Sequence, residues 1–367
     1  MTKNRGECTD SIVPTVGIAT FHRSLNFGAV LQAYALQQTL KAHGVDSEFI
    51  DFRKGEHISR DRTLKSRLRR ALLWVWDAPR RRKFDRFVGE HLKTSKYFPT
   101  YREVQEHRFP YRAVVCGSDQ VWNPELTEAT LPFFLLEFLP DTIARVAYAP
   151  SCGNKEAVQA RAEEFRQALP RFAALSIRES EELELIGDFA GGREVRTCID
   201  PTLLGGEALW EAVAVSPPER EPYMFFYSFG APRELTALAE RIALARGLKI
   251  VHFHKGRHFN CANRRVQPGP EEFVSLVKNA ECVLTNSFHG LVFSVIFEKE
   301  FLVQNVKGRG ARIRTLAAEL GFEQRCINAA EFAGTDIPDL DYGELKRRLE
   351  RLRASSLEYL LEALHVH

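Results

Sequence analysis

The chain lacks any run of about 18 uninterrupted apolar residues, so among its 367 residues we expect no helix that spans a membrane. Its first 14 residues carry charges and no apolar stretch, which is not the pattern of a secretory signal. Its seven cysteines include no CxxC pair, so we expect neither a disulfide framework nor a structural zinc site. These absences together lead us to expect a cytoplasmic protein.

Low-complexity segments and repeats of fixed period are also missing, and the composition is that of a folded enzyme. Hydrophobic residues make up 44% of the chain, charged residues 27% and aromatic residues 11%, which excludes a disordered or fibrous protein. At about 100–200 residues per domain, the length predicts two domains or one large one.

The net charge is small, but it is unevenly distributed along the chain. The formal net charge is +3, whereas the segment from Arg53 to Lys96 holds fifteen Lys or Arg and only five Asp or Glu. This segment has an excess of ten positive charges, so the rest of the chain carries a net charge of −7. No recognised nucleic-acid-binding motif accompanies the charge, and we expect no nucleic-acid partner.

Two amphipathic helices are predicted within this basic segment. Apolar residues recur at helical spacing from Leu64 to Trp76, Pro79 ends that pattern, and a second helix begins at Arg80–Lys83. One interpretation is that both helices pack on the first domain with solvated basic faces. The other is that the segment makes peripheral contact with an anionic membrane.

The first half of the chain predicts strands that alternate with helices, which is typical of a parallel α/β sheet. A short apolar run at 16–20 is followed by a polar loop, a helical pattern over 30–40 and an alternating strand over 47–52. Further elements are predicted as buried strands at 113–116, 145–148, 174–177 and 196–199 and as helices over 156–169 and 180–186.

A glycine pair at 205–206 and a proline-containing loop at 215–222 precede a second series of the same kind. Its predicted strands are 224–227, 248–253, 282–285 and 301–304, and its predicted helices are 233–246, 271–278, 289–297 and 342–364. We therefore predict an α/β fold with two Rossmann-like domains that face each other across a cleft. The predicted units are a tail (1–14), an N-terminal domain (15–205) with a basic helical insertion (53–98), a C-terminal domain (206–340) and a C-terminal helix (341–367).

Ligands of open α/β sheets bind outside the carboxyl ends of the strands, so the residues after each predicted strand are candidates for a site. The first strand is followed by His22, Asn26 and Gly28, and a glycine that enters a helix leaves backbone N–H groups able to hold an anion. A close-packed turn is the alternative. The third strand is followed by a crowded polar and aromatic cluster: Ser118, Asp119, Gln120, Trp122 and Asn123. A helix cap explains one of these residues but not the whole cluster.

Arg178 follows another predicted strand. Arginine binds a carboxylate or phosphate bidentately and does not lose its charge, so this position suits an anionic ligand. The alternative is a structural ion pair with Glu179 or Asp200.

His289 lies between a predicted buried strand and an apolar helix, beside Asn286 and Ser287. A helix N-terminus favours anions, and histidine is the side chain best suited to exchange protons near neutral pH. The next strand is followed by a glycine-containing loop with three cations: Lys307, Arg309 and Arg312. This loop is either a solvated basic surface or, together with the histidine, part of a site for an anionic substrate.

A metal site is not predicted. His252 and His254 share one face of a strand, and His258 and Cys261 follow them. Their spacing matches no familiar zinc pattern, and no carboxylate lies among them.

Six segments, in this order along the chain, resemble the polysaccharide pyruvyl transferase family: GIATFHRSLNFGAVLQAYAL, GSDQVWN, YAPSCG, SIRES, CIDPTLL and TNSFHG. The resemblance covers about 16–322, and GSDQVWN and the SFHG turn are its most specific parts. It implies a two-domain fold similar to GT-B glycosyltransferases. It also implies transfer of a pyruvyl group from phosphoenolpyruvate to two hydroxyls of a sugar, as a cyclic ketal. The implied acceptor is an exopolysaccharide or other polysaccharide, or its lipid-linked precursor.

The resemblance places the family's first-domain arginine on Arg178 and its histidine on His289. The chain departs from many members at Ser287, where they carry an arginine, and at Arg309, which aligns nearest to a family lysine. We expect Arg178 and Arg309 to bind the donor's anionic groups from opposite domains.

The implied chemistry needs a proton donor, cations for the phosphate and carboxylate, and a base for the hydroxyl. His289 fits the first role and Asp119 the third, while Arg178, Arg309 and Arg312 fit the second. No step demands a metal or an organic cofactor. The other residues expected to bind substrate are Lys307, Ser287, Asn286, His22, Asn26, Gly28, Ser118, Gln120, Trp122 and Asn123.

Two other classes of protein compete with this interpretation. A nucleotide-sugar glycosyltransferase of the same fold would carry a carboxylate on the helix after the donor loop, yet 291–297 contains no acid and Glu298 comes only at its end. A non-catalytic relative that binds a glycan or an anion is the second alternative, and Ser287 in place of the family arginine favours it.

Overall fold

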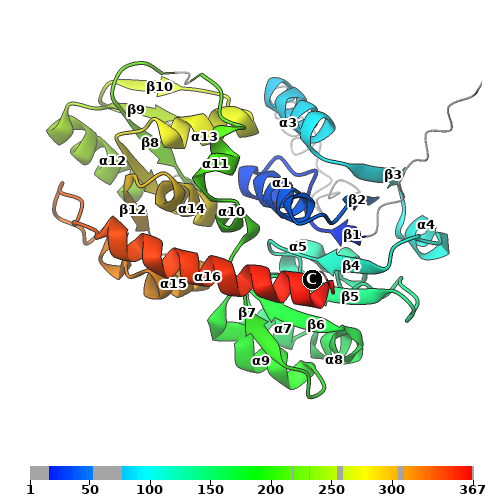
Figure 1. Cartoon of the computed structure of the whole chain (residues 1–367). Coiled ribbons are helices and arrows are strands. Elements are labelled where there is room, and N and C mark those ends of the chain that lie inside the picture. The colour runs from blue at the N-terminus through cyan, green and yellow to red at the C-terminus, as the bar shows by residue number, and fades with distance from the viewer. Residues whose placement is uncertain are drawn as a thin grey trace, which may run out of the picture.

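The computed structural model describes residues 16–52, 77–216, 219–230, 232–253, 259–304 and 310–365, in which the strands form two parallel sheets (Figure 1). The earlier part of the chain forms a seven-stranded sheet and the later part a six-stranded one. The fold is a GT-B-like, two-domain α/β fold, as predicted. The exact domain boundaries stay a prediction.

The seven-stranded sheet has the order β3-β2-β1-β4-β5-β6-β7. Its strands are β1 (Val16–Ala19), β2 (Ser47–Phe52), β3 (Thr94–Phe98), β4 (Ala113–Cys116), β5 (Ala144–Ala147), β6 (Ala174–Ile177) and β7 (Val195–Thr197). Val16 is paired with Ser47 on one side and with Ala113 on the other. Strands β1 and β4 are buried along their whole length, which explains their uninterrupted apolar sequences.

The six-stranded sheet has the order β10-β9-β8-β11-β12-β13. Its strands are β8 (Tyr223–Tyr227), β9 (Lys249–His252), β10 (Asn263–Arg265), β11 (Cys282–Thr285), β12 (Glu300–Gln304) and β13 (Cys326–Ile327). The edge strands β3 and β10 were not predicted, because neither carries an apolar run and β10 is exposed throughout.

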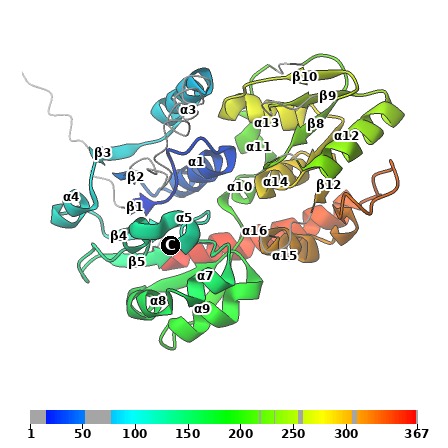
Figure 2. The same cartoon turned by 180° about the vertical axis from the view of Figure 1, so that it is seen from behind.

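Helices cover both sheets and fill the space between them (Figure 2). The helices are α1 (Phe27–Ala42), α3 (Ala78–His91), α4 (Tyr101–Glu106), α5 (Pro124–Thr127), α6 (Leu131–Phe134), α7 (Lys155–Gln159), α8 (Ala162–Ala168), α9 (Leu183–Phe189), α10 (Pro201–Leu204), α11 (Gly206–Glu211), α12 (Arg233–Arg246), α13 (Pro270–Lys278), α14 (Phe288–Ile296), α15 (Ala311–Leu320) and α16 (Tyr342–Ala363). The helix predicted over 156–169 is thus interrupted, since α7 and α8 are separate helices. Arg312, predicted on a loop, lies in the first turn of α15.

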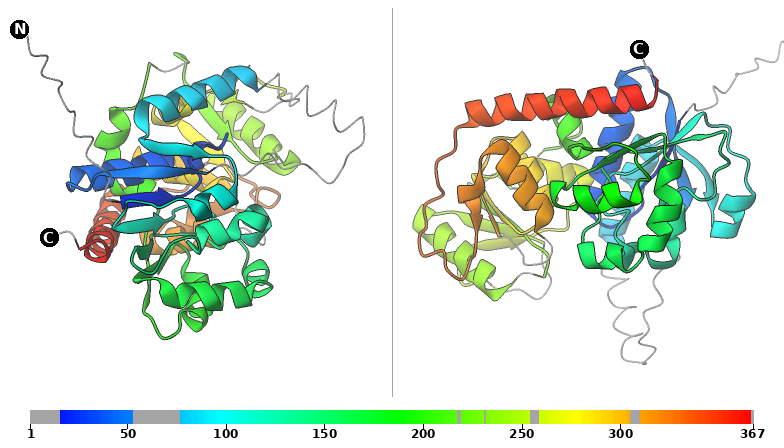
Figure 3. Two further views of the ribbon diagram at one scale, coloured as in Figure 1. Left: turned by 90° about the vertical axis from the view of Figure 1, so that its right-hand side faces the viewer. Right: turned by 90° about the horizontal axis from the view of Figure 1, so that it is seen from below.

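A continuous apolar core joins the two halves of the chain. Phe27 of α1 stacks on Phe273 of α13, with ring centroids 4.4 Å apart and planes at 10°. Helix α16 extends from the second half back along the first, where the Tyr359 hydroxyl donates to the Ala147 carbonyl at 2.8 Å (Figure 3). The shared core fixes the carboxyl ends of the two sheets relative to each other.

The described part of the basic segment packs against the protein. Helix α3 buries Phe84 and Phe87, as the first interpretation of this segment requires. The Arg80 guanidinium lies 4.7 Å from the centre of the Phe27 ring, and Lys83 Nζ contacts Glu272 of α13 at 2.6 Å. Helix α3 therefore connects both halves. The helix predicted at 64–76 lies outside the described residues.

No helix within the described ranges combines the length and the apolar character that a membrane span needs.

Candidate active site

A cavity of about 330 Å³ lies where the two halves of the chain meet, and both halves contribute to its wall. Its lining follows the carboxyl ends of β4, β5, β8 and β11, as the strand-end argument predicts. The lining residues are Asn26, Asp119, Gln120, Asn123, Glu125, Leu126, Gly153 and Asn154 from the first half, and Phe229, Asn286, Ser287, Phe288, His289, Arg312 and Ile313 from the second.

His289 occupies the second position of α14 and faces this cavity. Ser287 caps the helix by accepting a hydrogen bond from the Gly290 N–H, at 3.4 Å. The imidazole is only 6% exposed, and its Nε2 atom lies 3.5 Å from Asp200 Oδ2. Nε2 is thus buried and lies toward Asp200, whereas Nδ1 is the ring nitrogen on the side of Gly28.

Gly28 supports the imidazole from the first half of the chain. A Cβ atom added at Gly28 would lie 1.9 Å from His289 Nδ1, so only glycine allows this contact. The Gly28 N–H already donates to the side chain of Asn26 at 3.0 Å. The close-packed alternative for Gly28 therefore describes this turn, and an anion does not have that N–H to bind.

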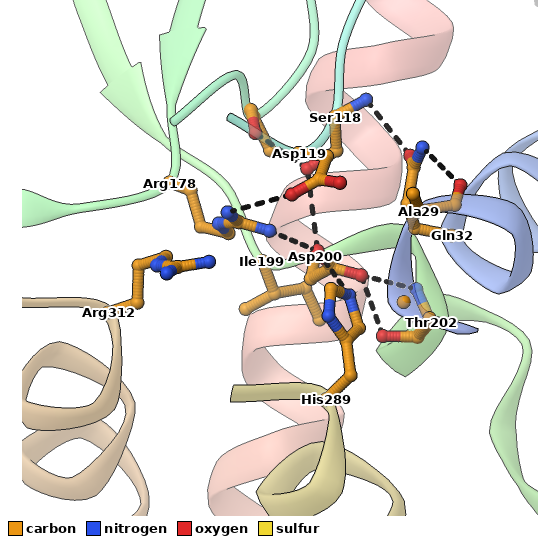
Figure 4. A network of polar contacts seen from close by, with 12 residues as sticks. Ala29, Gln32, Ser118, Asp119, Arg178, Ile199, Asp200, Thr202, His289 and Arg312 are labelled. Carbon is orange, nitrogen blue, oxygen red and sulfur yellow. Dashed lines mark hydrogen bonds and ion pairs between the residues drawn. The ribbon is translucent and has the colours of Figure 1, made fainter. Parts of the chain in front are cut away.

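Asp200 lies at the centre of a buried polar network (Figure 4). It caps α10 by accepting from the Thr202 N–H at 3.0 Å and from its hydroxyl at 2.6 Å, and it also accepts from Arg178. Burial raises the pKa of Asp200, but His289 and Arg178 outweigh it and hold that pKa well below its usual range. The ionised carboxylate can therefore accept a hydrogen bond from His289 Nε2–H.

Arg178 is enclosed by acids rather than open to the cavity. Besides Asp200, its Nε lies 3.4 Å from Glu179 Oε1 and its Nη2 lies 3.9 Å from Asp119 Oδ1. Burial lowers the pKa of Arg178, but the three carboxylates outweigh it and raise that pKa. The structural ion pair that the sequence left open is therefore formed.

Arg312 is the arginine that does line the cavity. The nearest carboxylate oxygen to its Nε is that of Glu179, at 4.0 Å, and its guanidinium lies 5.6 Å from the centre of the Phe288 ring. Burial and the neighbouring Arg178 lower the pKa of Arg312. An anion bound in the cavity would favour the charged form of Arg312 and so raise its pKa again.

Asp119 is held toward the cavity by its backbone. The preceding Ser118 is fixed by its N–H, which donates to Gln32 at 3.2 Å, and by its carbonyl, which accepts from Thr20 at 2.9 Å. Asp119 itself has φ 66°, a conformation that non-glycine residues rarely adopt and that is enriched at functional sites.

The remaining predicted residues divide into three groups. Asn26, Gln120, Asn123, Asn286 and Ser287 line the cavity. Three others are buried outside its wall: His22 contacts Asp51, Ser118 donates to the Ala149 carbonyl, and Trp122 packs between Phe165 and Phe172. Lys307 and Arg309 lie outside the described residues.

The sequence reasoning missed several residues of the site. Asp200 and Glu179 were considered only as possible partners of Arg178, and Asp200 also as part of an Asp-Pro turn. Phe288 lies 4.8 Å from the Arg178 guanidinium, and Phe229 lines the cavity mouth. The signal for Phe288 was its place in the same strand-to-helix turn as His289.

Glu182, close to Glu179 of the network, makes the folding stability depend on pH. Burial, Glu179 and Glu181 raise the pKa of Glu182 to about 7, and its Oε2 has no hydrogen-bond partner. The folded chain therefore keeps a proton on Glu182 up to about pH 7, whereas the unfolded chain releases it near its ordinary value of 4.5. Stability contributed by this group is lost as the pH rises across that interval.

We expect Glu182→Gln to raise the free energy of unfolding by about 1–3 kcal/mol more at pH 8 than at pH 4.5. The reason is that the amide of Gln carries no charge, so folding at high pH no longer has to bury or protonate a carboxylate. Urea unfolding at both pH values measures the difference. Glu184→Gln, two residues further along the chain, exposed and not among the groups that shift the pKa of Glu182, is the control and should show no such gain. An equal effect of Glu182→Gln at both pH values contradicts the prediction.

Within the described ranges, one group of side chains places three possible metal-ligand atoms close together: Glu90, His91 and Glu271. None of them lines the cavity. His252 packs against Phe259, and His254 and His258 lie outside the described residues.

Comparison with known proteins gives one family and a set of similar folds. The family model described as polysaccharide pyruvyl transferase matches residues 26–305, which is most of the chain. A search of curated protein sequences finds no match.

Two solved structures illustrate the likeness of fold. The UDP-GlcNAc 2-epimerase of Methanocaldococcus jannaschii superposes with a TM-score of 0.52 at 12% identity, covering 96% of this chain and 99% of that one. The UDP-GlcNAc 2-epimerase of Neisseria meningitidis, solved with UDP-GlcNAc bound, gives a TM-score of 0.53 at 8% identity, covering 96% and 99%. At such identities the likeness concerns the fold alone.

Proposed function

The chain belongs to the polysaccharide pyruvyl transferase family, and we propose that it transfers a pyruvyl group from phosphoenolpyruvate to two hydroxyls of a glycan, as a cyclic ketal. The acceptor is a polysaccharide or its lipid-linked precursor. The observation that carries the proposal is one cavity that brings together His289, Asp119 and Arg312 from the two halves of the chain. They match the proton donor, base and cation that this chemistry needs.

The reaction begins with proton transfer from His289 to the methylene carbon of the donor. The adjacent carbon becomes an oxocarbenium-like centre, and a sugar hydroxyl attacks it while its proton passes to Asp119. The bond from that carbon to the phosphate oxygen then breaks, and the second hydroxyl closes the ketal as its proton leaves with the phosphate. Asp119 then returns its proton to His289, directly or through solvent, so that over one cycle one hydroxyl proton replaces the proton given to the methyl group and the other leaves on the phosphate.

Asp200 positions the proton donor. Its buried carboxylate lies on the Nε2 side of the imidazole, at 3.5 Å, and Gly28 limits movement on the other side. An Nε2–H held by Asp200 orients the ring so that Nδ1 carries the proton that is transferred. Asp200 does not touch the cavity, so its role is exerted through His289.

The charges of the described site also indicate where the donor's anionic groups bind. Arg178 and Arg312 face three carboxylates, from Asp119, Glu179 and Asp200, so these arginines alone do not attract a phosphate and a carboxylate. Arg312 is the cation at the cavity wall. Lys307 and Arg309, shortly before it in the sequence, are the further cations that we assign to the donor.

Incubation with phosphoenolpyruvate and a panel of glycans tests the function. We expect phosphate release that depends on the glycan, together with the mass increase of one pyruvyl ketal on the product. Nucleotide sugars form a parallel arm. Glycosyl transfer in that arm, or binding without turnover in either arm, refutes the proposal in favour of a glycosyltransferase or of a non-catalytic relative.

Peripheral contact with anionic lipid at the cytoplasmic face completes the proposal, and the excess charge between Arg53 and Lys96 supports it. Arg80 is stacked within the protein, so Arg82 and Arg86, which are exposed on α3, are the positions to change.

We expect the chain to sediment with anionic vesicles but not with neutral ones, and less so as salt is added. At about 1 kcal/mol for each basic residue, the double variant Arg82→Ala/Arg86→Ala should bind at least about tenfold more weakly. Arg102→Ala on α4, outside the segment, is the matched control. Equal sedimentation with both vesicles leaves only the packed-helix interpretation.

A further inference from the structure

Two large apolar side chains remain exposed at the mouth of the cavity. Over the described ranges, the exposed large hydrophobic residues are Tyr97, Leu126, Val215, Phe229 and Leu244. Only Leu126, 44% exposed, and Phe229, 56% exposed, belong to the cavity wall. One comes from α5 in the first half and the other from the loop after β8 in the second, so they border the same opening from opposite halves. An exposed apolar pair at a cavity indicates contact with a ligand.

The position of Phe229 is fixed although its ring is exposed. Asn286 accepts a hydrogen bond from the Phe229 N–H at 2.6 Å and donates one to its carbonyl at 3.0 Å. The Tyr227 ring supports it at a centroid distance of 5.8 Å. Asn286 thereby links the aromatic ring to the turn that carries His289, so a ligand on Phe229 is placed relative to the proton donor.

Planar polar side chains surround the Leu126 side of the mouth. Asn154 donates to Glu125 at 2.9 Å, and Asn123 donates to Gln120 at 3.0 Å. Gly153 makes room for the pair of Asn123 and Gln120, because a Cβ atom at Gly153 would lie 2.4 Å from each of these two side chains. Amides both donate to and accept from neighbouring hydroxyl groups, and a carboxylate accepts from them.

We propose that Phe229 and Leu126 form a subsite for a pyranose ring of the acceptor, with the C–H face of the sugar on the Phe229 ring. Glu125 and Asn154 bind its hydroxyls. The donor does not fit this place, since Glu125 repels its anionic groups and the described cation of the wall, Arg312, lies next to Glu179 rather than Glu125. The identification of this sugar as the acceptor of the reaction rests on the proposed function. The binding of a sugar at this place does not depend on it.

Phe229→Ala tests the subsite, with Phe229→Trp as the variant that keeps an aromatic face. Leu244→Ala on α12, 67% exposed and outside the cavity, is the matched control. We expect Phe229→Ala to raise the KM for the glycan at least about tenfold and to leave the KM for phosphoenolpyruvate and the melting temperature unchanged. Phe229→Trp should have a glycan KM close to that of the wild-type chain. Leu244→Ala should change neither the glycan KM nor the phosphoenolpyruvate KM.

Saturation-transfer NMR with lipid-free gluco- and galacto-configured oligosaccharides gives a readout that needs no turnover. We expect transfer to the C–H protons of one sugar ring in the wild-type chain and its loss in Phe229→Ala. If this holds while no ketal forms, the proposed function fails and the subsite stands. Transfer that is unchanged in Phe229→Ala, or absent from every oligosaccharide in the wild-type chain, overturns the subsite whatever the activity.

Discussion

His289→Ala is expected to lower turnover by about 10²–10⁴-fold, the usual loss when a general acid is removed. The imidazole is the titratable side chain that meets both the cavity and the Asp200 carboxylate, so no neighbour in the described wall can take its place with the same orientation. Steady-state phosphate release at saturating donor and acceptor measures the loss. The KM for the acceptor should change little, because none of the contacts proposed for the sugar is made by His289.

Gly28→Ala displaces the same imidazole without removing it. A Cβ 1.9 Å from Nδ1 forces the ring away, and a misplacement of about 1 Å costs about 10²-fold in rate. Gly89→Ala on α3, where a Cβ meets nothing within 4 Å, is the control and should retain full activity. If His289→Ala turns over like the wild-type chain, or Gly28→Ala like Gly89→Ala, the role assigned to the imidazole is wrong.

The central strands could be predicted because they are buried on both faces, which makes their sequences apolar without interruption. Strands β1, β4 and β11 are continuous apolar runs in the sequence. The carboxyl ends of β4 and β11 therefore indicated Asp119 and His289 as candidate site residues. Strand β10 could not be predicted, since its residues Asn263–Arg265 are all exposed at a sheet edge. Pairing with β9 makes it a strand, and that pairing is a tertiary contact.

The roles of charged residues could be predicted less well than their positions. Arg178 was correctly placed at a strand end, and the adjacent Glu179 and the distant Asp200 were considered as its partners, but Asp119 was not, because only the folded chain brings that segment to the arginine. Asp200 carries the signal of an Asp-Pro turn and does cap α10, yet it also contacts Arg178 and His289. Trp122 stands in the most specific motif and is nevertheless wholly buried in the core.

The two arginines of the site should therefore respond in opposite ways when they are replaced. Arg178→Ala leaves the carboxylates of Asp119, Glu179 and Asp200 buried without their shared cation, and breaking a buried ion pair costs about 3–5 kcal/mol of stability. Arg312→Ala removes a desolvated cation beside another one, so the free energy of unfolding should fall by less than about 1 kcal/mol or rise. Its affinity for phosphoenolpyruvate should fall by about 1.5–3 kcal/mol, the range for hydrogen bonds to charged groups.

Urea unfolding and calorimetric titration with phosphoenolpyruvate separate these two effects, and pH gives a further check. Asp200 has its pKa lowered in the folded chain, so the stability it contributes is complete above its unfolded pKa of about 3.8 and is lost as the pH falls toward its folded value. Because Arg178 is one of the groups that lower this pKa, the destabilisation by Arg178→Ala should be larger at pH 7 than at about pH 2.5, below the unfolded pKa. If Arg178→Ala loses affinity for phosphoenolpyruvate but keeps the stability of the wild-type chain, Arg178 binds the donor. Normal donor affinity in Arg312→Ala removes Arg312 from it.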